Sequence, residues 1–130
     1  MKNLSAEWVK VAEDDIDTAL FCYEGKRYLW ALFMCQQALE KIIKALYIEI
    51  NDKIPPKKHD LIELAGHINI FEECSEETKD LFRRLTRYYI KTRYPENLLE
   101  LKQKTGKETT FLLLNKTQEV FKWIKEKLNQ

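Results

Sequence analysis

The chain has 130 residues, 45% of them hydrophobic and 33% charged, and its formal net charge at pH 7 is +1. These values predict one soluble globular domain over residues 1–130, since domains commonly hold about 100–150 residues. A balanced charge excludes the whole-surface attraction to nucleic acid or membranes that a strongly basic protein shows.

Helical spacing dominates the first fifty residues. Apolar residues recur at three- and four-residue steps over residues 4–23, which predicts a helix with Ser5 as its N-cap and Gly25 as its stop. A second helix is predicted over residues 28–50. Its apolar residues cover more than one face, so we expect it to be either central in the fold or part of an oligomer contact.

Capping signals mark two later helices. A short helix is predicted over residues 61–67, because Asp60 can cap it and Glu63 stands three residues later, as in a capping box. This helix follows a proline-containing loop and is expected to lie in a crossover. Thr105 and Glu108 form the same pattern before the last predicted helix.

Between these signals, Ser75 can cap a fourth helix. Proline disfavours a helical conformation at the residue before it, so Tyr94-Pro95 is expected to end this helix. The set predicts an all-α fold, an up-and-down bundle of four to five helices with one short crossover helix. The fourth helix places Tyr88 and Tyr89 on its inner face and Arg83, Arg84, Arg87 and Lys91 on its solvated side.

Polar side chains stand among apolar ones on the first two helices, where bundles build their sites. One interpretation is an internal network in which Asp15 pairs with a lysine, because buried charges must be paired in any fold. The other is a ligand site that uses lysines of the second helix. The residues concerned are Asp15, Gln36, Gln37, Glu40, Lys41 and Lys44.

Common catalytic and metal-binding motifs are absent, among them the phosphate loop and H-E-x-x-H. The three cysteines form no C-x-x-C pair, and His59 and His67 stand eight residues apart, so the sequence predicts neither a metal site nor a cofactor. No stretch approaches the ~18 apolar residues of a membrane span. We therefore expect a reduced, cytoplasmic setting without membrane contact.

Four segments in order carry a resemblance to a known family: "AEDDIDTA", "QQALEKIIKAL", "PPKKHDLIEL" and "RYYIKTRYPEN". Together they resemble the HEPN domain (higher eukaryotes and prokaryotes nucleotide-binding domain). The resemblance implies a four- to five-helix bundle, often dimeric. It also implies a gene often found beside one for a minimal nucleotidyltransferase, the two proteins forming a toxin–antitoxin or stress module.

Many HEPN domains are ribonucleases that use an R-x4-6-H motif across a dimer interface. In this sequence no histidine stands five to seven places after any arginine. What remains is an R-Y-P variant, Arg93-Tyr94-Pro95, which the resemblance places in a branch of less certain activity. We therefore predict a non-catalytic module.

The same segment supports a nucleotide-binding interpretation, in which cations contact phosphate and a tyrosine offers a stacking face. A structural interpretation is also open, in which Tyr94-Pro95 ends a helix and Arg93 pairs with Asp15 or Glu40. The nucleotide-binding candidates are Lys41, Lys44, Arg87, Tyr88, Arg93 and Tyr94.

Three functions follow from these observations. The first is a non-catalytic HEPN module, a homodimer or higher oligomer that acts with a minimal nucleotidyltransferase. The second is direct binding of a nucleotide or RNA through Arg93 and the basic side of the fourth helix. The third is a metal-independent ribonuclease toxin with a relocated catalytic histidine, His59 acting with Arg93.

Overall fold

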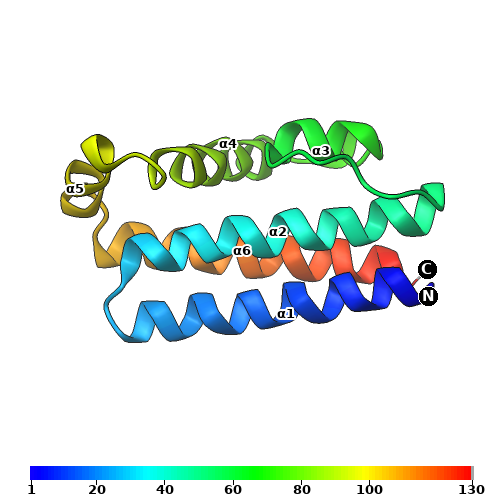
Figure 1. The fold of residues 1–130 in the computed structure, drawn as a ribbon, viewed down its shortest axis with the longest axis horizontal. Coiled ribbons are helices and arrows are strands. Elements are labelled where there is room, and N and C mark those ends of the chain that lie inside the picture. The colour runs from blue at the N-terminus through cyan, green and yellow to red at the C-terminus, as the bar shows by residue number, and fades with distance from the viewer. Residues whose placement is uncertain (130) are drawn as a thin grey trace.

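The computed structural model describes residues 1–129, which fold into six α-helices and one short 3-10 turn, with no strand in this range. Four long helices lie side by side along the long axis of the molecule, and each runs antiparallel to the long helix before it (Figure 1). The predicted all-α, up-and-down bundle is therefore confirmed. The helices are α1 (Asn3–Glu24), α2 (Tyr28–Asn51), α3 (Leu61–His67), α4 (Glu76–Lys91), α5 (Pro95–Lys104) and α6 (Lys107–Leu128), and the 3-10 turn is Phe71–Glu73.

Helix α2 is the centre of the bundle, because it packs against α1, α4 and α6 (Figure 1). Its side chains Leu32, Leu39 and Ile42 are fully buried. Removing such apolar surface from water contributes about 25 cal/mol per Å² to the stability of the fold. The wide apolar arc of α2 is thus explained by its central position, and the arc itself requires no partner chain.

Two helices begin as the capping signals predict. The Asp60 carboxylate accepts hydrogen bonds from the backbone N–H groups of Ile62 (3.0 Å) and Glu63 (3.3 Å) at the start of α3. The Ser75 hydroxyl accepts one from the N–H of Thr78 (3.1 Å) at the start of α4. These bonds satisfy N–H groups that have no partner within the helix.

Two predicted caps are wrong. Helix α1 begins at Asn3, so Ser5 lies inside its first turn, where the hydroxyl is buried without a hydrogen-bond partner among residues 1–129. Helix α6 has Gly106 at its N-cap position. Thr105 precedes this position and its hydroxyl makes no cap bond; it donates to the carbonyl of Leu101 in α5 (2.6 Å).

Helix α5 was not predicted, and the expected role of Tyr94-Pro95 is wrong. Helix α4 has already ended at Lys91, and Tyr94 is the N-cap of α5 with Pro95 at its first position. Proline suits that position, because its fixed φ matches the helix and its missing N–H would have no partner there. Helix α5 lies at the end of the bundle and contacts α2 and α4 (Figure 1). Arg93 therefore lies in the short link between the end of α4 and the start of α5.

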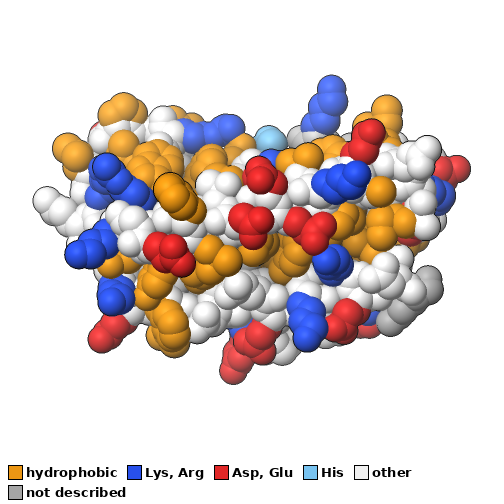
Figure 2. Space-filling view, turned by 90° about the horizontal axis from the view of Figure 1, so that it is seen from below, with side chains coloured by type: hydrophobic (Ala, Val, Ile, Leu, Met, Phe, Trp, Pro, Cys, Tyr) orange, Lys and Arg blue, Asp and Glu red, His pale blue; other side chains and the backbone are white. Residues whose placement is uncertain are grey.

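The surface is mixed in charge. On the face drawn in Figure 2, acidic and basic side chains lie side by side along the bundle, and hydrophobic side chains gather towards the end where α1 passes into α2. None of the helices between residues 1 and 129 combines the length and the apolar character that crossing a membrane requires.

Candidate functional site

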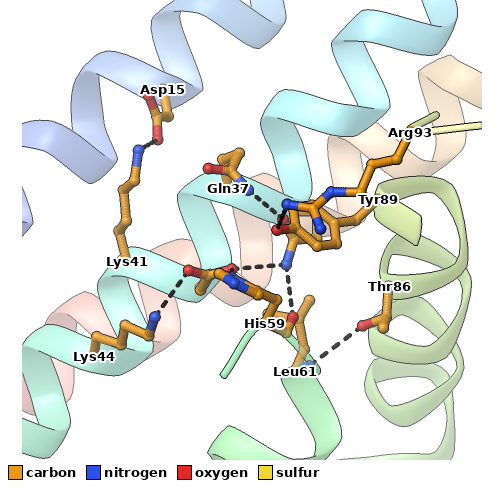
Figure 3. A network of polar contacts seen from close by, with 11 residues as sticks. Asp15, Gln37, Lys41, Lys44, His59, Leu61, Thr86, Tyr89 and Arg93 are labelled. Atoms are coloured by element: carbon orange, nitrogen blue, oxygen red, sulfur yellow. Dashed lines mark hydrogen bonds and ion pairs between the residues drawn. The ribbon is translucent and has the colours of Figure 1, made fainter. Parts of the chain in front are cut away.

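Three side chains from two parts of the chain meet beside the end of α4, and we call them the Tyr89 cluster: His59, Tyr89 and Arg93 (Figure 3). The His59 and Tyr89 ring centres are 5.0 Å apart. The Arg93 guanidinium lies 4.6 Å from the centre of the Tyr89 ring and donates a 2.6 Å hydrogen bond to the Tyr89 hydroxyl. The two candidate residues His59 and Arg93 therefore converge on one tyrosine.

A buried carboxylate orients His59. Nδ1 of His59 lies 3.0 Å from Oε1 of Glu40, whose side chain is only 6% exposed. An ionised carboxylate can only accept hydrogen bonds, so Nδ1 carries the proton and donates. This tautomer leaves Nε2 as the nitrogen available to a ligand, on a side chain that is 49% exposed.

The loop that carries His59 is held to the bundle on two sides. Gln36, fully buried in α2, donates to the backbone carbonyl of His59 (2.8 Å) and to Glu40 (3.1 Å), and its own carbonyl accepts from Gln37 (2.7 Å). Two residues after His59, the N–H of Leu61 donates to the hydroxyl of Thr86 in α4 (3.3 Å, Figure 3). These bonds fix the position of the imidazole relative to α4.

The lysines of α2 are engaged in ion pairs. Lys44 is buried and donates to Glu40 (2.9 Å), with its ammonium also 5.7 Å from the ring centre of Trp8. Lys41 donates to Asp15 of α1 (2.6 Å), a pair that is 22% and 8% exposed at the two side chains. Lys44 is therefore in no position to contact a ligand phosphate, because moving it would leave Glu40 buried with a missing partner.

The aromatic ring of the cluster is buried and packed on α2. Tyr89 is 6% exposed, and its ring stacks on Phe33 with centres 5.7 Å apart and planes 16° from parallel. Burial raises the pKa of the Tyr89 hydroxyl above its usual value, against a lowering by the charge of Arg93 and with a smaller rise from Glu40. The hydroxyl is therefore neutral at pH 7, and its oxygen accepts the bond from Arg93.

The sequence model of the HEPN domain family matches residues 5–128 of the chain. The chain belongs to the HEPN domain family. No curated protein and no solved structure matches it. The assignment rests on the four-segment resemblance and the helical bundle together with this match.

In this HEPN domain, the predicted pairing of Arg93 with Asp15 or Glu40 is wrong. Asp15 is held by Lys41, and Glu40 by Lys44 and His59. The reason is geometric: both carboxylates are on the inner side of the bundle, whereas Arg93 follows the last turn of α4. Within residues 1–129 the polar partner of Arg93 is the Tyr89 hydroxyl.

The remaining candidates of the HEPN domain lie outside the Tyr89 cluster. Arg87 is exposed on α4 and takes no part in the contacts that join His59, Tyr89 and Arg93. Tyr88 is half-buried against the core. Tyr94 is 49% exposed at the N-cap of α5. The ring that Arg93 contacts is instead Tyr89, which the sequence assigns to the inner face of the fourth helix.

Spacing alone could have indicated this ring, because residues four apart meet when the chain makes a helical turn between them, and Arg93 follows Tyr89 by four residues in the turn after α4. The contact with His59 could not be read in the same way, since it depends on the path of a loop. Among residues 1–129, no three His, Cys, Asp or Glu side chains gather as metal ligands. The chemistry that the cluster offers is an exposed guanidinium and an oriented imidazole in contact with the same tyrosine ring.

Proposed function

We propose that this HEPN domain is a non-catalytic recognition module that binds the phosphate of a nucleotide or of RNA at the Tyr89 cluster. One observation carries the proposal: two exposed side chains, His59 and Arg93, contact the same buried tyrosine ring. Arginine has five N–H donors in a fork that matches phosphate oxygens, and only one bond, to Tyr89, uses them here. The other donors are available to an anion.

Calorimetry with ATP, GTP and a short RNA tests this function. We expect salt-sensitive binding that Arg93→Ala weakens about tenfold or more, because hydrogen bonds to charged groups contribute about 1.5–3 kcal/mol. Arg87→Ala is the matched control, since it removes an equal charge from an exposed position of α4 outside the cluster. Absence of heat with all three ligands, or equal affinity of the Arg93 variant, would contradict the proposal.

We further propose that the domain works as a homodimer or higher oligomer. The support is exposed apolar surface at one end of the bundle, where Phe111 and Leu112 of α6 are 48% and 68% exposed and line an open groove with Tyr23 of α1. Light scattering at micromolar concentration should give at least twice the chain mass, and Leu112→Glu should reduce it. A monomer under these conditions would contradict the oligomer.

The partner part of the proposal is a minimal nucleotidyltransferase in a cytoplasmic toxin–antitoxin-like or stress module. Its support is the membership of the HEPN family together with the missing R-x4-6-H motif, which fits recognition better than RNA cleavage. Co-purification of the two proteins from cells tests it. A gene neighbourhood without a nucleotidyltransferase counts against it.

A second candidate function is a metal-independent ribonuclease with His59 as a relocated catalytic histidine. The observation that favours it is the Glu40–His59 bond, which fixes the tautomer that a general base requires at Nε2. In that case wild-type protein cuts a labelled RNA in the presence of a chelator, and His59→Ala does not. RNA that stays intact after long incubation would remove this candidate.

A further inference from the structure

A row of aromatic rings continues from the Tyr89 cluster towards the start of α2. Phe33 stacks on Tyr89 with ring centres 5.7 Å apart, and Trp30 packs edge-on against Phe33 at 5.9 Å. Phe33 and Trp30 are one helical turn apart on α2, and both are partly exposed. The row therefore leads from Arg93 to the beginning of α2 along the surface.

A basic pocket lies at the far end of this row. Trp30 lines it together with Lys26 and Arg27 of the α1–α2 turn and Lys102 near the end of α5, and none of its lining residues is acidic. Within residues 1–129, none of the three cations forms an ion pair. Figure 2 shows Lys and Arg side chains beside hydrophobic ones at this end of the molecule. An anion there would meet three uncompensated positive charges.

We propose that this pocket binds a second phosphate of a single-stranded RNA whose first phosphate is held at Arg93, with bases contacting Trp30 and Phe33 between them. The inference rests on the proposed function of the Tyr89 cluster and extends it to an oligonucleotide. Arg93 does not line the pocket, and the two are connected through Tyr89, Phe33 and Trp30 by successive contacts of 4.6, 5.7 and 5.9 Å, so they are two distinct cationic sites with rings between them.

The combination of rings and cations favours a single strand. Proteins bind single-stranded nucleic acid by stacking bases on aromatic side chains beside a positive groove. In a duplex the faces of the bases are stacked on one another and are not available to Trp30 and Phe33. The carboxylates of an acidic peptide could pair with the cations but would not stack on these two rings. The row and the pocket together thus match unpaired nucleotides joined by phosphates.

Fluorescence anisotropy with labelled oligo(A) RNA of one to eight nucleotides tests the inference, with unlabelled AMP as competitor. For wild-type protein, affinity should rise with length until both phosphates are reached. The double variant Arg27→Ala/Lys102→Ala should bind the longer RNAs about tenfold more weakly and bind AMP as wild type does. Each lost phosphate contact should also reduce the slope of log affinity against log salt by about 0.7.

Matched variants separate the two proposals. Arg83→Ala/Lys91→Ala removes the same charge from the outer side of α4 and should leave the length dependence unchanged. Unchanged RNA affinity in the Arg27/Lys102 variant, or equal binding of AMP and long RNA, would overturn the second phosphate site alone. If the wild-type protein bound neither AMP nor RNA, the proposed function itself would be overturned, and the second phosphate site with it.

A second readout reports the bases directly. The chain has three tryptophans, so the variant Trp8→Phe/Trp123→Phe keeps Trp30 alone. We expect the longer RNAs to quench its fluorescence and AMP to leave it unchanged. Saturating RNA without quenching would overturn the base contact at Trp30.

Discussion

Two charged regions of this HEPN domain differ in what they can do. The polar strip of α2, made of Gln36, Glu40 and Lys44, is buried, and its side chains bond one another and the His59 loop. The basic face of α4 carries Arg83, Arg87 and Lys91, which are exposed. The basic face has more cations, yet it is the side chains of the strip that hold one another and the His59 loop in fixed positions. A run of charge in the sequence is thus a weaker guide to a site than polar residues forced to find partners.

The largest expected effect comes from breaking the strip. Glu40→Ala leaves Lys44 buried without its carboxylate and His59 without its orienting partner. We expect a loss of about 3–5 kcal/mol in the free energy of unfolding, measured by urea denaturation. Glu77→Ala, at an 83% exposed side chain paired with Lys116, is the control and should cost less than about 1 kcal/mol. Equal effects of the two substitutions would contradict the comparison.

A smaller loss is expected at Gln36, which connects the strip to the loop. Gln36→Leu keeps the volume but leaves the His59 carbonyl without this donor and removes one of the two donors to Oε1 of Glu40. The expected cost is about 1–3 kcal/mol of unfolding free energy. The same substitution at Gln37, which is only half-buried, should cost less. A Gln36 variant as stable as the wild type would show that these bonds do not hold the loop.

The Cys35 thiol is buried on α2 as the polar strip is, but it has no charged partner. Burial raises the pKa of the Cys35 thiol to about 12; a hydrogen bond with Thr117 lowers it, and Cys22 adds a smaller rise. The unfolded chain releases this proton near pH 9 and the folded chain does not, so stability should fall as pH rises from 9 towards 12. The slope from this group is about 1.4 kcal/mol per pH unit, and Cys35→Ala should remove it. Identical pH profiles of the two proteins would contradict this assignment.

The smallest effect is expected on the basic face of α4. Arg87→Ala should change the free energy of unfolding by no more than about 0.5 kcal/mol, because an exposed side chain loses no buried partner. Urea denaturation in parallel with the Glu40 variant measures it. A loss above 2 kcal/mol would mean that this face is also part of the structural network.

The sequence predicts most of the fold, because period and capping act locally. The helices over α1, α2 and α3 were placed within one residue at each end, and Asp60 and Ser75 cap as expected. Helix α5 was missed because Pro95 can end one helix or begin the next, and the choice depends on packing at the end of the bundle. The wide arc of α2 likewise had two explanations that only the tertiary packing distinguishes.

The candidate site was less predictable. His59 and Arg93 were both selected, but their meeting point, Tyr89, was assigned only to the core. Glu40 and Asp15 are instead paired with Lys44 and Lys41 of α2, so neither carboxylate pairs with Arg93. Which lysine pairs with which carboxylate depends on how the helices pack. The contact between His59 and Tyr89 depends on the path of the loop after α2, and local helix propensity does not predict that path.

The most direct test of the central claim uses the two histidines of the chain, His59 and His67, as paired reporters in a proton–nitrogen NMR titration with AMP. Binding at the Tyr89 cluster should shift the imidazole signals of His59 and leave those of His67, at the end of α3, unchanged. Arg93→Ala should abolish the shift, and Arg87→Ala should preserve it. Signals of His59 that stay unchanged at saturating AMP, or that move together with those of His67, would contradict recognition at this site.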